Sequence, residues 1–289
     1  MRLSQAAGGL LSPYAGHRMQ GQLPPSVEDR ELTSTSIGST DLTLNLRRYV
    51  ADRDAGGHGL WREEIETRIL PASEVAIIIC DMWDQHWSRG ATERVAEMAP
   101  RMNDIIAAVR AKGAHIIHAP SDTLGFYDGT PARKRVTSAP VVAPPLELDH
   151  ADPPLPIDDS DAGSDTGETE PYHAWSRQHP ALEIDAARDA ISADGREVYN
   201  LLHLWGVTQV VMMGVHTNMC VLNRSFAIKQ MVRWSVPIAL ARDLTDAMYN
   251  PAMSPYVSHT EGTALVIGYI ERFWCPSIAS TDLVGIPKR

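Results

Sequence analysis

Cysteine, phenylalanine and lysine are all scarce in this sequence, which has three cysteines, three phenylalanines and four lysines among 289 residues. The cysteines, Cys80, Cys220 and Cys275, are too few and odd in number for a disulfide framework. We therefore expect a reducing compartment and a cytoplasmic protein.

Long apolar runs and an excess of positive charge are also missing. No run approaches 18 apolar residues, and the first 20 residues lack the apolar centre of a signal peptide, so we expect neither a membrane span nor a leader. The formal net charge of -10 argues against nucleic acid or an anionic membrane as the main partner.

Hydrophobic patterning divides the chain into two parts. Residues 1–70 read as an N-terminal arm followed by a β-hairpin extension, because Leu42, Leu44 and Leu46 alternate along one face of a strand. Residues 71–289 read as the main domain, interrupted by a Pro-rich and then acidic insertion at 139–171. We expect no internal repeats.

The main domain alternates strands with helices. The run VAIIIC (75–80) is apolar throughout, as in a strand buried on both faces. This order predicts an α/β fold with a doubly wound, mostly parallel sheet and helices on both faces. The predicted strands are 75–80, 114–119, 182–184, 208–214 and 236–241, and the predicted helices are 92–112, 195–205, 218–233 and 260–273.

Sites in such sheets lie beyond the carboxyl ends of the strands. That rule selects Asp81, His118, the turn Gly214–Cys220 and Asp243. Cys220 comes at a strand-to-helix turn, where free N–H groups favour a thiolate and can bind an oxyanion. A cysteine can also be simply a small buried side chain, and this alternative stays open.

Asp81 directly follows a buried strand, where a carboxylate is costly unless it has a partner or a task. It could also be a turn or cap residue. The strands that precede Asp81 and Cys220 are expected to be neighbours in the sheet, which favours a shared role for the two residues.

Two motifs then resemble the isochorismatase-like cysteine hydrolases. ICDMWDQ (79–85) is similar to the end of that family's first strand, and GVHTNMCV (214–221) is similar to its nucleophile turn. The resemblance covers roughly residues 75–120 and 195–250. It implies a small-amide hydrolase that uses an Asp–Lys–Cys triad and a thioester intermediate.

By this resemblance, Asp81 is the base and Cys220 the nucleophile. The resemblance also implies a cis peptide between Val215 and His216, and an oxyanion hole made by the backbone N–H groups of His216 and Cys220. The family's lysine has no counterpart in residues 182–195. We expect Lys134 to replace it, with Arg188 as the alternative, since Arg can stabilise a thiolate although it cannot give up its proton.

The cleft is expected to take a small, flat, polar substrate. Its expected lining is Trp83, His86, Trp87, His118 and Asn218. The sequence lacks the Asp-Trp-His pattern of the nicotinamidase metal site, so we expect no metal and no cofactor. Asp84, His86, His118 and Asp122 remain possible metal ligands, and the acidic loop 158–168 could be a calcium loop or only a solvated lid.

We thus expect an amidase that acts on a small molecule and forms a homo-oligomer. The alternative is a non-catalytic binding protein on the same fold, with the triad broken at the lysine. A redox-sensing thiol is less favoured, because Cys80 is expected on the opposite face of its strand from Asp81.

Overall fold

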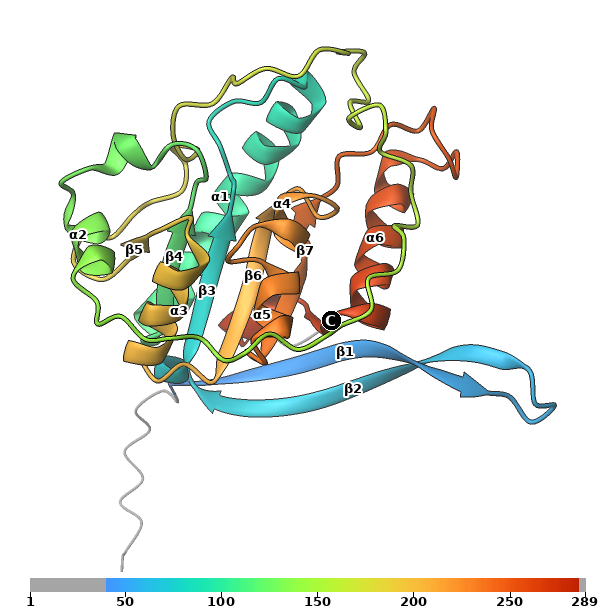
Figure 1. The fold of residues 1–289 in the computed structure, drawn as a ribbon, viewed down its shortest axis with the longest axis horizontal. Helices are drawn as coiled ribbons and strands as arrows, with labels where there is room; N and C mark the ends of the chain where they lie inside the picture. The colour runs from blue at the N-terminus through green and yellow to red at the C-terminus, as the bar shows by residue number, and fades with distance from the viewer. Residues whose placement is uncertain (1–39, 286–289) are drawn as a thin grey trace, which may run out of the picture. The chain divides into compact units, whose positions relative to one another are not determined.

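The computed structural model describes residues 40–285, which are built around an eight-stranded sheet (Figure 1). The strand order is β2-β1-β8-β7-β6-β3-β4-β5. The strands are β1 Asp41–Arg53, β2 Gly59–Pro71, β3 Val75–Cys80, β4 His115–Ala119, β5 Ala190–Ile191, β6 Gln209–Val215, β7 Ile238–Asp246 and β8 Ser277–Ile278. Strands β3 to β8 pair in parallel, and β1 pairs antiparallel with both β2 and β8. The predicted α/β fold is confirmed.

Helices cover both faces of the sheet. They are α1 Arg89–Ala111, α2 Pro131–Thr137, α3 Gly195–Leu204, α4 Cys220–Asn223, α5 Ile228–Arg233, α6 His259–Phe273 and α7 Thr281–Val284, with short 3-10 turns at Ala72–Glu74 and Leu124–Tyr127. Side chains of β3 alternate between two cores: Ile78 packs with α3, α5 and α6, and Ile77 packs with α1 and α7. This alternation is why VAIIIC is apolar at every position. No helix of residues 40–285 is long and apolar enough to cross a membrane.

Helix α1 shows how local signals set an element's bounds. Ser88 caps its first turn by accepting a hydrogen bond from the Ala91 backbone N–H, so the helix begins three residues before the predicted position. Gly113 follows its last residues at φ +104°, a conformation that suits glycine, and the chain turns into β4.

Two predicted elements differ from the observed ones. Residues 182–184 are not a strand. The edge strand is β5, eight residues later, and it extends the sheet beside β4. The predicted helix 218–233 is split into α4 and α5, because Arg224 takes an extended backbone at φ -61° and ψ 155°.

The predicted hairpin is present, and it forms one end of the sheet. From Thr40 onward the chain clusters as one compact unit. Leu42, Leu44 and Leu46 share a face, as predicted, and are buried in the same core as α1 and α7. Strand β2 is the outermost strand and pairs with β1 over the full 13 residues.

Residues 139–189, here named the crossing segment, run from α2 to β5 with little regular structure. In Figure 1 the segment passes α3 and α5, rises beside α6 and returns over the carboxyl ends of the strands. Early in its course the Leu148 N–H donates to the Arg233 carbonyl (2.8 Å), and near its end Gln178 forms a bridge with Trp83. The segment therefore covers the edge of the sheet where the candidate site lies.

Candidate active site

The candidate site lies where β3 and β6 end side by side. Cys80, the last residue of β3, pairs with Gly214 of β6. Gly214 has φ +110°, and a Cβ there would lie 2.1 Å from the Cys80 carbonyl oxygen. Glycine is thus required by both the backbone conformation and the close approach. The absence of a side chain brings the turn that carries Cys220 against Asp81.

Asp81 is fully buried and adopts φ +45°, the left-handed region that few residues other than glycine enter. One carboxylate oxygen accepts from the Ser121 N–H at 2.7 Å, and the other accepts from Arg224 Nε at 3.0 Å. Asp81 is also hydrogen-bonded to the Cys220 side chain. Burial raises the pKa of Asp81, against the opposing effects of Arg224 and these hydrogen bonds. A carboxylate held in this way is suited to accept a proton.

Cys220 is half-buried at the start of α4. Burial, followed by the negative charge of Asp81, raises the pKa of the Cys220 thiol to about 12, while Arg224 and the His216 backbone N–H act to lower it. We expected the helix N-terminus to favour a thiolate. Helix α4 has only four residues, and its effect is outweighed by burial and by the carboxylate. The resting sulfur is therefore a protonated thiol beside a base.

The nucleophile turn has the backbone that the sequence motif predicts. The Val215–His216 peptide is cis, as expected. The His216 N–H is directed at the Cys220 sulfur, so it lies where an oxyanion donor would be useful. Beyond it, the Thr217 N–H donates to the Asp246 carbonyl at 2.8 Å, which ties the turn to the end of β7.

The cation of the site is Arg224, not Lys134 or Arg188. Arg224 bonds Asp81 through Nε and Asp122 through Nη2 at 3.1 Å. Lys134 is exposed on α2, and Arg188 is 59% exposed and paired with Asp185. Both predicted placements were therefore wrong.

A signal for Arg224 was present in the sequence. It follows Cys220 by four residues, the spacing that places two side chains on one face of a helix. The family pattern places the cation in residues 182–195 instead, where this chain has no lysine.

Aromatic side chains close the site on the side of α1. Trp83 stacks on Trp175 of the crossing segment, with ring centroids 4.2 Å apart, and His86 stacks on the same Trp175 at 5.6 Å. His86 also meets the His216 ring edge-on at 4.9 Å. Burial lowers the pKa of His86 to about 4 and is the main cause that lowers that of His216 to about 3, so both rings are neutral.

These rings and Asp81 border a narrow, partly open cavity that has no room for a water molecule in this structure. It is lined by Asp81, Trp83, Gln85, His86, Thr92, Val95, Val215 and His216. The Nε2 atom of His216 is buried without a hydrogen-bond partner. Such an atom is free to bond a polar substrate group. Sequence reasoning missed Trp175, because it lies in a segment without periodicity.

The other predicted lining residues have different surroundings. Trp87 packs with Ala91 and Met248. His118 is fully buried and bonds Gln178 at 2.9 Å and Asp189 at 3.0 Å. Neither ring borders the cavity beside Asp81.

Asn218 links the turn after β6 to two other segments. Its amide group bonds both the N–H and the carbonyl of Met248, and it also donates to Asp159 of the crossing segment at 2.8 Å. It thereby holds the nucleophile turn to the loop after β7. That strand continues through Asp246, so Asp246 and not Asp243 lies at its end.

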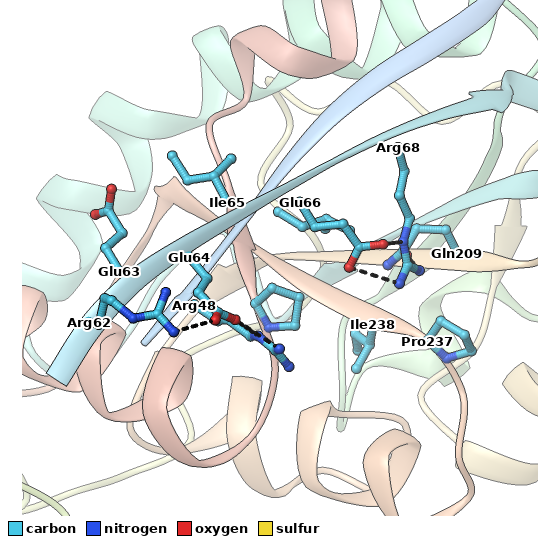
Figure 2. Close-up of a pocket in the computed structure, with 12 residues that line it drawn as sticks. Arg48, Arg62, Glu63, Glu64, Ile65, Glu66, Arg68, Gln209, Pro237 and Ile238 are labelled. Atoms are coloured by element: carbon cyan, nitrogen blue, oxygen red, sulfur yellow. Dashed lines mark hydrogen bonds and ion pairs between the residues drawn. The ribbon is translucent and has the colours of Figure 1, made fainter. Parts of the chain in front are cut away.

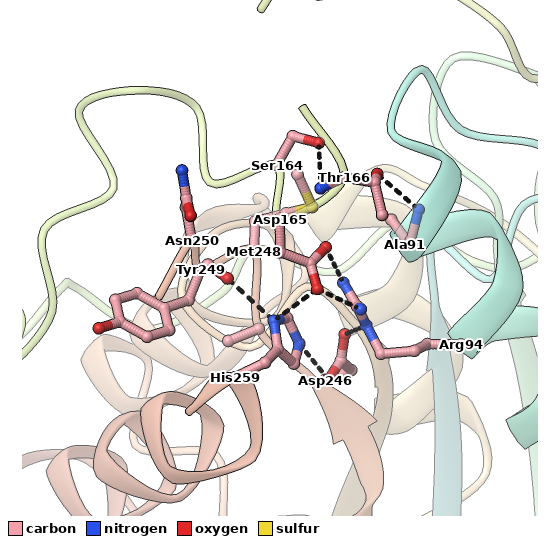
Figure 3. A network of polar contacts seen from close by, with 12 residues as sticks. Ala91, Arg94, Ser164, Asp165, Thr166, Asp246, Met248, Tyr249, Asn250 and His259 are labelled. Atoms are coloured by element: carbon pink, nitrogen blue, oxygen red, sulfur yellow. Dashed lines mark hydrogen bonds and ion pairs between the residues drawn. The ribbon is translucent and has the colours of Figure 1, made fainter. Parts of the chain in front are cut away.

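A polar network fastens the crossing segment above the site (Figure 3). Arg94 of α1 bonds Asp165 of the segment and Asp246 of β7, both at 2.8 Å. His259, the first residue of α6, bonds Asp246 at 2.9 Å and lies 3.5 Å from Asp165. One arginine and one histidine thus link four parts of the chain around the site.

The residues considered as metal ligands have separate partners. Asp84 accepts from Ser176 of the crossing segment, and Asp122 pairs with Arg224. In the acidic loop, Glu168 accepts from Ser164 and Thr166. Across the described residues, no three His, Cys, Asp or Glu side chains gather in a way that could hold a metal ion.

Comparison with known proteins gives structural neighbours only. No protein-family model and no curated protein matches the sequence. A cysteine hydrolase from Pseudomonas syringae pv. phaseolicola 1448A matches with a TM-score of 0.49 at 14% identity, over 75% of this chain and 93% of its own. A putative isochorismatase from Burkholderia xenovorans LB400 gives 0.45 at 14% identity, over 73% and 86%. PnC1 from L. infantum, solved in complex with nicotinate, gives 0.39 at 13% identity, over 73% and 95%.

Proposed function

We propose that this chain is a cysteine hydrolase of the isochorismatase-like type that cleaves a C–N bond in a small amide. The observation that carries the proposal is the placement of the Cys220 thiol beside the buried carboxylate of Asp81, which also accepts a hydrogen bond from Arg224 Nε. A nucleophile, a base and a group that orients the base are the components of nucleophilic catalysis.

The first half-reaction would form a thioester. Asp81 takes the proton from Cys220 as the sulfur attacks the carbonyl carbon, and the carbonyl electron pair moves to oxygen. The His216 and Cys220 backbone N–H groups are the proposed donors to that oxyanion. When the intermediate collapses, the C–N bond breaks and the protonated Asp81 gives its proton to the departing nitrogen.

Water would complete the second half-reaction. Asp81 removes a proton from the water that attacks the thioester, the C–S bond breaks, and the thiolate recovers the proton. Arg224 stabilises the negative charge that moves between Asp81 and the sulfur, because it stays protonated throughout. If this chain only bound a ligand, we would expect no cation beside Asp81 and Cys220. Arg224 supports the enzyme.

The test is a panel of small primary and N-carbamoyl amides with detection of released ammonia. Cys220→Ala should lose at least about 1,000-fold in rate, since nucleophile loss removes several orders of magnitude. Cys275→Ala is the matched control, because Cys275 is buried in the core and has no part in the site. Mass spectrometry of quenched reactions should detect an acyl group on Cys220. Turnover by the Cys220→Ala variant would overturn the proposal, and tight binding without turnover or adduct would favour the binding protein.

A further inference from the structure

In the part of the chain that the structure describes, strand β2 leaves one long edge of the sheet without a neighbour. Among residues 40–285 it pairs with β1 alone, whereas the strand at the opposite end, β5, has only two residues. In Figure 1, β2 lies below β1 from its carboxyl end to the point where the two ribbons cross toward the hairpin turn. A long edge with free backbone groups can pair with another strand.

The side chains of β2 differ sharply between its two faces. Ile65 and Ile69 lie on one face and are 53% and 67% exposed. The other face carries Arg62, Glu64, Glu66 and Arg68, which are among the residues drawn in Figure 2, and Arg68 bonds Glu66 at 2.7 Å. Large exposed apolar side chains in a row indicate a surface that associates with another.

The sequence of β2 is self-complementary in one antiparallel register. If Thr67 lies opposite Thr67 of a second copy, Glu66 faces Arg68 of that copy, and Ile65 faces Ile69. The same two pairs recur on the other side of the axis. Opposite charges and matched apolar side chains directly across a strand pair are both favourable.

Neighbouring registers lack this match. With Ile65 at the axis, Glu64 would face Glu66 and Arg62 would face Arg68, which places like charges opposite each other. With Glu66 at the axis, Glu64 would face Arg68, but two glutamates would meet at the axis and Glu63 would face Ile69. Like charges directly across a strand pair are destabilising.

We propose that β2 pairs antiparallel with β2 of a second copy of this chain, about a twofold axis at Thr67, so that the two sheets join into one. The contact is isologous, as twofold dimers require. The contact covers Ile65 and Ile69, and it pairs the backbone N–H and C=O groups on the outer edge of β2. The catalytic proposal does not depend on it.

Charge exchange tests the register. Light scattering during gel filtration of the full chain should give twice the chain mass of 31.7 kDa. Glu66→Arg places arginines opposite each other twice and should shift the protein to monomer. The double variant Glu66→Arg with Arg68→Glu restores opposite charges and should restore the dimer. A monomeric wild type, a dimeric Glu66→Arg variant, or a folded double variant that stays monomeric would each overturn the proposal.

A cross-link keeps the test decisive if a charge variant fails to fold. Thr67→Cys brings two thiols together at the axis, within the spacing that a disulfide accepts. Ile65→Cys is the matched control, since its two copies would lie about 13 Å apart along the strands. Mild oxidation should give a covalent dimer through residue 67 and none through residue 65. Equal cross-linking, or none at residue 67, would contradict the pairing.

Discussion

Replacing Arg224 with glutamine tests the site where the structure departs most from the sequence prediction. The Asp81 carboxylate is fully buried, whereas the Arg224 side chain is 31% exposed. Breaking a buried ion pair by removing one partner costs about 3–5 kcal/mol. Solvent reaches Arg224, and Asp81 keeps its hydrogen bond from Ser121, so we expect a smaller loss of about 2 kcal/mol.

Two measurements test this expected loss of stability. The unfolding temperature of Arg224→Gln should fall by roughly 4–8 °C, because a domain of this size loses about 2–4 °C per kcal/mol. Arg224 also lowers the pKa of the Cys220 thiol, so its removal leaves less thiolate at any pH. Alkylation of Cys220 by iodoacetamide, followed by mass spectrometry from pH 6 to 10, should slow by about tenfold or more, the effect of 1.4 kcal/mol or above.

Lys134→Gln and Arg188→Gln are the matched controls, because both remove an exposed cation elsewhere on the surface. Each should change stability by less than about 0.5 kcal/mol and leave the alkylation rate unchanged. If Arg224→Gln labels and unfolds like the wild type, or if Lys134→Gln shows the same losses, the cation has been assigned to the wrong residue.

Two further changes probe the supports of the site. Gly214→Ala would place a Cβ 2.1 Å from the Cys80 carbonyl at φ +110°, so we expect a loss of about 3 kcal/mol or more in chemical unfolding, and a wild-type midpoint would contradict the close approach. Burial alone would lower the pKa of His259, but Asp246 outweighs it and raises that pKa. The stability that this raised pKa provides is complete below about pH 6.5 and is lost as the pH rises through the folded-state value. His259→Asn should remove this loss between pH 6 and 9, and an unchanged pH profile of stability would count against the pair.

The regular core was predictable because its signals are local. The run 75–80 is apolar at every position and is buried on both faces, and α1 is followed by Gly113 in a left-handed turn. The first strand of the hairpin also alternates as predicted, with Leu42, Leu44 and Leu46 buried. Each of these features depends on neighbours in the sequence, which a single chain displays directly.

The site was only partly predictable, because it depends on contacts between distant segments. Arg224 reaches Asp81, 143 positions earlier in the chain, because β3 and β6 end side by side at one edge of the sheet. His118 was expected in the cleft, but Asp189 and Gln178 hold it in a buried network elsewhere. Trp175 closes the site from the crossing segment, which has no hydrophobic periodicity from which its position could be predicted. The homo-oligomer expected from the sequence stays a prediction.

An arginine in place of a lysine changes how such a site would respond to alkaline solution. A lysine ammonium next to a catalytic pair can be neutralised as hydroxide accumulates, and the site then loses its counterion. The guanidinium of Arg224 keeps its charge, and the neighbouring carboxylates of Asp81 and Asp122 raise its pKa further. Any decline of the reaction at high pH would therefore have to originate in the substrate, in the chemistry of the sulfur, or in loosening of the crossing segment. The cation of this site would keep its charge at a pH at which a lysine in its place would lose it.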